Sequence, residues 1–200
     1  MTATIHSPEI SAPGSVLLDA AGMRAGARVL DVGCGRGDIT LAAARRVGRS
    51  GLALGVDASL TVLEDARRRA ATAGLGHVGF VHGDPQTQRF APLRFDVILS
   101  AVGLDVFADA DAGVANLARA LRGGGRLALL ARDDLVPLRA ALDRAGLVDV
   151  AAVATGVVTA TAPGSLATVS SPAASESRCP PTGAAGATAP GPRSGAPARG

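Results

Sequence analysis

The residues best suited to chemistry in this chain lie in one short stretch, from Asp31 to Asp38. An apolar run carries one acid and is followed by three glycines at alternate positions, Gly33, Gly35 and Gly37, and then by an alanine-rich segment with helical spacing. Glycine adopts positive φ and lets a ligand approach the backbone, so this pattern predicts a strand, a binding loop and a helix start. An acid at the end of that strand suits a ligand with an ammonium group.

A second acid, Asp57, ends a buried strand predicted over residues 51–57. It follows the glycine loop by about 20 residues, the distance at which Rossmann-like folds present a carboxylate to ribose hydroxyls. The spacing also argues against the usual dinucleotide fingerprint, because G-x-G-x-x-G would need glycine where Asp38 stands. A nicotinamide oxidoreductase therefore fits the predicted fold but not the glycine spacing.

Strand and helix patterns alternate along the chain, which indicates an α/β fold. The predicted helix over 60–73 begins after Ser59, a favourable N-cap, and carries the charged pairs Glu64/Arg68 and Asp65/Arg69. The glycine run at 123–125 is predicted to be a turn before the fifth strand. The other expected helices cover 12–23 and 39–47, with two more around 114–121 and 135–145, and the expected strands are 28–32, 51–57, 77–81, 95–100, 127–131, 147–153 and 157–162.

The stretch 29–37 resembles the first motif of class I S-adenosylmethionine-dependent methyltransferases, and the order of features after it resembles the same family. The resemblance implies a Rossmann-like, mostly parallel seven-stranded sheet flanked by helices, with an antiparallel hairpin at its end. It also implies that S-adenosylmethionine is the cofactor, with the first acid and the glycine loop holding its methionine part and a Gly-Asp pair after the third strand holding its adenine. The cofactor-binding residues expected on this basis are Asp31, Gly33, Cys34, Gly35, Gly37, Asp57, Ala58, Gly83, Asp84, Pro85 and Ser100.

Within the family, residues 83–130 resemble most the ubiquinone/menaquinone-biosynthesis type, which implies a small-molecule methyl acceptor. The stretch 100–103 does not match the Asn/Asp-Pro-Pro-aromatic signature of enzymes that methylate base amino groups. Two departures from the family stand out. Pro85 has no N–H to offer an adenine ring, which would either weaken adenine recognition or shift it to Gln86. The chain is also shortened after the fifth strand, where relatives carry a substrate-covering segment.

Several alternatives stay open on the sequence alone. The departures from the family leave room for a non-catalytic remnant that binds the cofactor without turnover, and no catalytic residue is assigned. The helix over 12–23 either covers the cofactor or simply packs on the sheet. Cys34 is expected to be a small residue between glycines rather than a reactive thiol, and His82 a loop residue rather than a base. No metal site is expected, although a magnesium site could draw on Asp105, Asp133 and Asp134.

Composition narrows the class of partner. The net charge is +3 and the pI is near 10.0, but the charges almost balance through residue 160 and there is no basic block with interleaved aromatics, so nucleic acid is disfavoured. The two cysteines have no metal or disulfide spacing. Neither a leader nor a long apolar run is evident, which favours a cytoplasmic protein without membrane contact. The predicted organisation is a lead-in segment 1–26, a domain 27–160 and a disordered tail 161–200 rich in Ala, Gly, Pro, Ser and Thr.

Overall fold

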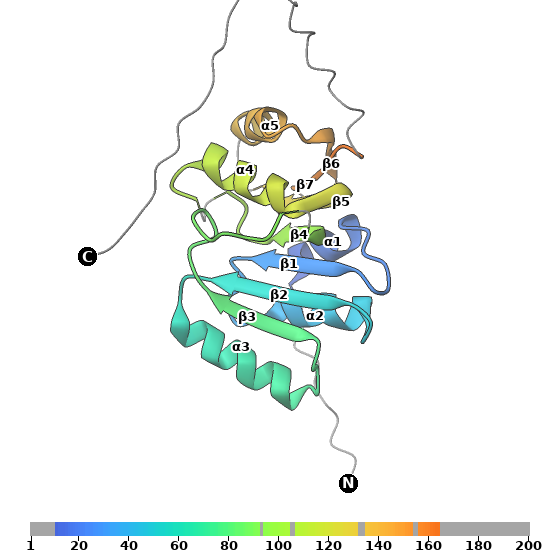
Figure 1. Ribbon diagram of the computed structural model, residues 1–200, viewed down its shortest axis with the longest axis vertical. Helices are drawn as coiled ribbons and strands as arrows, with labels where there is room; N and C mark the ends of the chain where they lie inside the picture. The colour runs from blue at the N-terminus through green and yellow to red at the C-terminus, as the bar shows by residue number, and fades with distance from the viewer. Residues whose placement is uncertain (1–10, 93, 105–106, 132–134, 154–155, 165–200) are drawn as a thin grey trace, which may run out of the picture. The chain divides into compact units, whose positions relative to one another are not determined.

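The chain forms one seven-stranded sheet with helices on both faces (Figure 1), and the predicted order of elements is confirmed. The computed structural model describes residues 11–92, 94–104, 107–131, 135–153 and 156–164. The elements are α1 (Ala12–Ala20), β1 (Arg28–Val32), α2 (Asp38–Val47), β2 (Leu52–Asp57), α3 (Leu60–Thr72), β3 (Val78–His82), β4 (Phe95–Ser100), α4 (Ala110–Ala120), β5 (Leu121–Leu130), α5 (Leu135–Arg144), β6 (Val148–Val153) and β7 (Val157–Thr161).

The strand order is β3-β2-β1-β4-β5-β7-β6, and β7 runs antiparallel to both of its neighbours. The first five strands are parallel, with Asp31 opposite Gly55 and Asp57 opposite His82. Since the carboxyl ends of parallel strands meet at one edge, the loops after β1, β2, β3 and β4 lie together there. The predicted seven-stranded, mostly parallel fold with its terminal antiparallel hairpin is thus confirmed.

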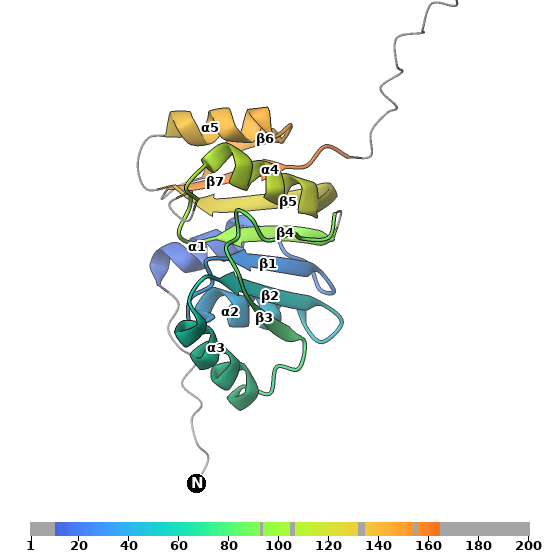
Figure 2. The ribbon, with the colours of Figure 1, turned by 60° about the vertical axis from the view of Figure 1, so that its left-hand side comes forward.

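Two apolar cores hold the helices to the sheet, one on each face (Figure 2). α1 and α2 pack on one face through Leu17, Leu18 and Val47, and α4 and α5 pack on the other through Leu117 and Leu142. β1 and β4 are covered on both faces, which explains why their sequences are mostly apolar rather than alternating between apolar and polar residues.

The lead-in helix α1 is shorter than the predicted 12–23. It ends at Ala20 and is followed by a turn with Gly22 at a φ of 60°. The helix packs against α2, β5 and β7, and its buried residues are Gly14, Leu17 and Leu18. Only Ser11, its N-cap, reaches the cavity described below.

Strand β5 begins six residues before the predicted start. The glycines at 123–125 lie inside it rather than in a turn, and they fall where the pairing with β4 shifts register, between Phe95 opposite Leu121 and Val97 opposite Arg126. Backbone bonds between Ala162 and both Gly124 and Gly125 extend the pairing on the other side. The glycines therefore form an irregularity within the strand, a use of glycine that is common in sheets.

Strand β6 lies at an edge of the sheet and pairs only with β7. Most of its side chains are exposed, and its pairing shifts between Val148 and Ala151, where Asp149 takes a φ of 54°. The final strand ends at Thr161, one residue before the predicted 162, and Ala162 is buried and donates a backbone hydrogen bond to the Gly125 carbonyl. The rest of the predicted tail, 165–200, lies outside the described residues.

Helix α3 buries Leu63, Ala66 and Ala70. Its predicted charge pairs are wrong, because Asp65 pairs with Arg68 and with Arg36 of the glycine loop, while Arg69 pairs with Asp38. Ser59 occupies the N-cap position without a capping bond from its side chain. Tertiary partners within reach thus replace pairs that helical spacing alone would favour.

Candidate functional site

A cavity of about 340 Å³ lies at the carboxyl edge of β1, around the glycine loop. Asp31 forms part of its wall, and α2 starts at its margin. The predicted residues that line it are Asp31, Gly33, Cys34 and Gly35, joined by Ser11, Arg36, Asp38, Ile39 and Ala101.

The three loop glycines all adopt positive φ, at 69° for Gly33, 51° for Gly35 and 82° for Gly37. This conformation is the one that the spacing predicts, and side chains other than glycine rarely adopt it. A Cβ at Gly33 would lie 2.5 Å from Val102 in the loop after β4, whereas a Cβ at Gly35 would meet nothing within 4 Å. The loop is therefore packed closely on one side and open at Gly35.

Asp31 is 1% exposed, and its Oδ2 accepts a hydrogen bond from the Thr40 hydroxyl at 2.6 Å. The pKa of Asp31 is raised to about 7, mainly by burial. The Thr40 hydrogen bonds oppose this rise, and the nearby acids Asp57 and Asp38 contribute to it. A buried carboxylate among other acids is a poor place for a second anion. It is a favourable place for a cation, which would stabilise the ionised form.

Asp57 lies at the tip of β2 and supports the glycine loop directly. Its Oδ2 accepts from the Gly35 N–H at 2.9 Å, and its Oδ1 accepts from the Ser59 N–H at 2.9 Å. The side chain is half-buried, and each oxygen has a further lone pair. Asp31 and Asp57 thus flank one loop from two neighbouring strands, although Asp57 does not line the cavity itself.

The loop after β3 departs from the predicted arrangement. The Asp84 carboxylate is turned to its own loop, where it accepts from the Gln86 N–H at 2.9 Å and from the Thr87 hydroxyl at 3.4 Å. Gln86 is also engaged, since its Oε1 accepts from the Asp109 N–H at 2.8 Å. Asp84 is exposed and follows β3 at the same edge of the sheet, but it does not line the cavity that contains Asp31. Asp31 and Asp57 thus lie against the glycine loop, whereas Asp84 bonds its own loop.

The remaining predicted residues lie around these loops. Ala58 is exposed, and its carbonyl oxygen lies 3.0 Å from His82 Nε2. Ser100 is fully buried, and its hydroxyl donates to the Gly103 carbonyl at 3.3 Å within the loop after β4. Gly83 packs against Gln88, where a Cβ would lie 2.5 Å from the amide oxygen.

Cys34 packs against Gly55 of β2, where a Cβ would lie 2.7 Å from the cysteine sulfur. Its side chain is buried, and burial, together with Asp31 and Asp57, raises the pKa of the thiol. A thiol whose thiolate is disfavoured in this way is a weak nucleophile. The geometry thus agrees with the expectation of a small residue in a tight space.

Three residues support the site in ways that the sequence did not predict, and of these only Arg69 was named from the sequence, as a partner of Asp65. Thr40 bonds Asp31, Arg69 bonds the glycine loop, and Asn116 of α4 donates to the carbonyls of Pro85 and Gln88 at 3.0 and 2.9 Å. Asn116 is 6% exposed in the middle of a helix, and a buried amide in an otherwise apolar helical stripe is the sequence signal that could have found it.

Arg69 clamps the loop from α3. Its Nη1 donates to the Arg36 carbonyl at 2.7 Å, and its Nη2 pairs with Asp38 at the start of α2. We expect Arg69→Met to weaken S-adenosylhomocysteine binding about fivefold in titration calorimetry, because a partly buried ion pair and one charge-assisted bond are lost. The control is Arg144→Met on α5, whose exposed pair with Asp111 of α4 does not involve the glycine loop. Equal weakening by both variants would contradict this role.

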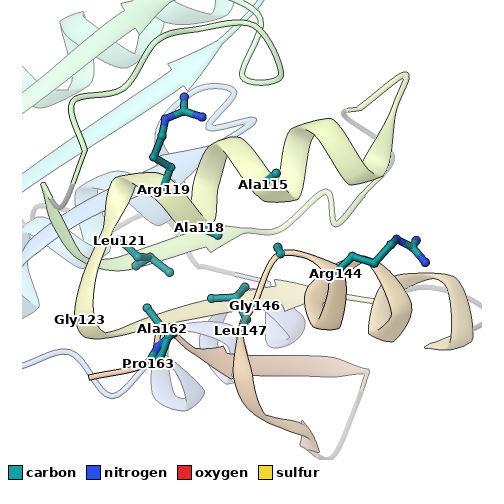
Figure 3. Close-up of a pocket in the computed structure, with 11 residues that line it drawn as sticks. Ala115, Ala118, Arg119, Leu121, Gly123, Arg144, Gly146, Leu147, Ala162 and Pro163 are labelled. Atoms are coloured by element: carbon teal, nitrogen blue, oxygen red, sulfur yellow. The ribbon is translucent and has the colours of Figure 1, made fainter. Parts of the chain in front are cut away.

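A larger cavity, of about 820 Å³, lies elsewhere in the domain (Figure 3). It is at the amino end of β5, between the ends of α4 and α5, and its wall is mostly small and apolar, with Ala118, Leu121 and Leu147 among its residues. The Arg144 guanidinium at its rim extends toward Asp111, with which it pairs at 2.6 Å. None of the predicted cofactor-binding residues lines this cavity.

No group of three or more His, Cys, Asp or Glu side chains suited to a metal ion occurs among the described residues. The residues of the possible magnesium site, Asp105, Asp133 and Asp134, lie outside that part of the chain. Within it, no helix has the length and apolar character needed to cross a membrane.

Comparison with known proteins identifies the family. A family model described as a methyltransferase domain matches residues 29–125. Nocamycin O-methyltransferase of Saccharothrix syringae is 39% identical over 113 residues, which are 56% of this chain and 40% of that protein. The ubiquinone/menaquinone biosynthesis C-methyltransferase UbiE of Hahella chejuensis is 36% identical over 114 residues, 56% of this chain and 46% of that protein.

The fold is likewise shared with solved structures. The crystal structure of a SAM dependent methyltransferase from Aquifex aeolicus superposes with a TM-score of 0.66 at 21% identity, over 74% of this chain and 89% of that one. The chain matches less than half the length of the two curated relatives. Residues 29–125 therefore belong to a methyltransferase domain, and the fold around them is that of the class I S-adenosylmethionine-dependent methyltransferases.

Proposed function

We propose that this domain binds S-adenosylmethionine at the carboxyl edge of β1 and β2 and transfers its methyl group to a small-molecule acceptor. The observation that carries the proposal is the glycine-loop cavity, which has the buried Asp31 in its wall and Asp57 bonded to the loop behind it. The donor set fits the cofactor, because it offers an acid for an ammonium group and a second acid with free lone pairs for ribose hydroxyls.

The chain's own residues have distinct tasks in this mechanism. Asp31 would pair with the ammonium group of the methionine part, and the open backbone at Gly35 would let the ligand lie against the loop. Asp57 would accept from the ribose while it keeps its bond to the Gly35 N–H. When bound, S-adenosylmethionine supplies a methyl group already activated on a sulfonium, so the protein's part is to align the acceptor and exclude water.

Adenine recognition is the weakest part of the fit. Asp84 already accepts two bonds from its own loop, Pro85 has no N–H, and the N–H and side-chain oxygen of Gln86 are both used within the protein. The remaining lone pairs of Asp84 could still accept from the exocyclic amine, as the family resemblance implies. We therefore assign the adenine a smaller share of the binding energy than the methionine part.

Few residues are available to cover the methyl acceptor. β5 ends at Leu130 and α5 starts at Leu135, which agrees with the absence of a long covering segment after the fifth strand. An acid or base residue is needed only if the acceptor must lose a proton before or during transfer. The relatives described above include an O-methyltransferase and a C-methyltransferase, which supports a small-molecule acceptor but leaves the acceptor atom open.

The test has two stages. Titration calorimetry with S-adenosylhomocysteine measures binding, and a cofactor-turnover assay with mixed small-molecule acceptors measures transfer. We expect binding in the micromolar range, followed by turnover with at least one acceptor class. Binding without turnover would instead favour the second candidate, a non-catalytic remnant that binds the cofactor, which is motivated by Pro85 and the short β5–α5 connection. Absence of binding would contradict both.

A further inference from the structure

The Asp31 carboxylate is surrounded by groups that do not neutralise it. Asp57 and Asp38 face it from β2 and α2, and the neighbouring thiol of Cys34 is protonated because its pKa is raised. Two arginines of this region are engaged with other acids, since Arg36 pairs with Asp65 and Arg69 pairs with Asp38. The carboxylate therefore depends on hydrogen bonds to hold its position and charge until a cation arrives.

Thr40 supplies those bonds. It lies in the first turn of α2, is 0% exposed, and its hydroxyl donates to Asp31 Oδ2 at 2.6 Å. Its backbone N–H acts on the same carboxylate. A hydroxyl in the first turn of a helix normally bonds water or its own backbone, and complete burial against one carboxylate oxygen restricts both side chains to a single arrangement.

We propose that Thr40 is a positioning residue whose hydroxyl orients Asp31 toward the ammonium group of the methionine part, and that it makes the site selective for ligands that carry this group. The inference rests on the proposed function and goes beyond it, because it divides the ligand into a part that depends on Thr40 and a part that does not. The adenosine portion would be recognised by other elements, at the ends of β2 and β3.

Two ligands separate these parts. S-adenosylhomocysteine carries the amino-acid portion, and 5′-methylthioadenosine lacks it. We expect Thr40→Val, which removes the hydroxyl at nearly constant volume, to weaken S-adenosylhomocysteine binding about 10- to 30-fold in calorimetry and to change 5′-methylthioadenosine binding less than twofold. Thr40→Ser keeps the hydroxyl and should restore affinity to within about threefold of the original. Thr72→Val, which removes an exposed hydroxyl from α3, is the matched control.

A pH profile adds a readout that simple loss of packing would not change. Since the pKa of Asp31 is raised to about 7, a proton must leave before the ammonium group binds, and affinity should fall about tenfold per pH unit below that value. Thr40→Val removes a bond that favours the ionised form, so the midpoint of this fall should move to higher pH. The affinity for 5′-methylthioadenosine should show no such dependence.

The outcomes are distinct. Equal weakening of both ligands, failure of Thr40→Ser to restore binding, or an unmoved midpoint would overturn the role of Thr40. If the unaltered protein binds neither ligand, the proposed function fails and this inference with it. If Thr40→Val does not fold, Thr40→Ala removes the same hydroxyl without the second branch and is measured by the same comparison.

Discussion

Asp31→Asn should abolish tight S-adenosylhomocysteine binding and, at the same time, stabilise the unliganded domain at alkaline pH. The substitution keeps the shape of the side chain and removes its charge, so the ammonium group of the ligand loses its buried partner. Losing one side of a buried charge pair costs about 2 to 5 kcal/mol, which corresponds to a loss in affinity of roughly 30- to several thousandfold. Calorimetry at pH 8 measures this loss.

The gain in stability follows from the direction of the pKa shift. The pKa of Asp31 is raised in the folded state from 3.8 to about 7, so its contribution to stability is fully present below pH 3.8 and is lost as the pH rises through 7. Asparagine has no charge to desolvate and escapes this loss. We expect the variant to be more stable than the original by roughly 2 to 4 kcal/mol at pH 8.

Urea unfolding without ligand at pH 5 and pH 8 tests the gain. The advantage of Asp31→Asn should be several times larger at pH 8, whereas Asp143→Asn, an exposed site on α5, should show little difference at either pH. If the difference in unfolding free energy between Asp31→Asn and the original does not grow from pH 5 to pH 8, the ionised carboxylate does not destabilise the free protein. If Asp31→Asn is more stable than the original but binds the ligand more weakly, Asp31 serves ligand binding rather than stability.

Gly33→Ala is expected to have the second large effect, a loss of about 3 to 4 kcal/mol in the free energy of unfolding. The backbone at Gly33 has a φ of 69°, which costs a residue with a Cβ about 1 to 2 kcal/mol. The new Cβ would also lie 2.5 Å from Val102 Cγ2, so the loops after β1 and β4 would have to separate. Overpacking of this kind adds about 1 to 3 kcal/mol.

Two comparisons separate strain from overlap. Gly35 has a similar φ of 51°, but a Cβ there would meet no atom within 4 Å. Gly35→Ala should therefore lose only the roughly 1 to 2 kcal/mol that comes from backbone strain. Adding Val102→Ala to Gly33→Ala should recover the part of the stability that is lost to overpacking and leave the part that is lost to backbone strain. Urea unfolding of the original, Gly33→Ala, Val102→Ala and the double variant gives the coupling energy between the two sites, and a coupling near zero would contradict the close packing of the two loops.

The glycine loop and the parallel sheet could be predicted from local pattern. Alternate glycines after a buried strand have few other uses, and all three have the positive φ that the spacing requires. Strand β5 was harder, because consecutive glycines favour a turn locally, and only pairing with β4 on one side and β7 on the other keeps them in the sheet.

The partners of charged side chains were the least predictable part of the site. Helical spacing favours Asp65 with Arg69, yet Arg36 and Asp38, about thirty residues earlier, lie close enough in space to take both partners. The orientation of Asp84 could not be predicted either. A loop carboxylate can face a ligand or its own backbone, and the path of the loop decides which. Thr40 carried no signal of its own, because a threonine in a first helical turn is ordinary.

The irregular strand β6 has a consequence for the behaviour of the protein at high concentration. An exposed edge strand offers free backbone groups to another molecule, and regular edges can join into extended sheets. Asp149 disfavours such pairing in two ways: it places a charge on the edge strand, and its left-handed backbone breaks the regular repeat of the strand. A β-branched residue at this position would both strain the backbone and remove the charge, and we expect it to favour pairing between molecules along this edge.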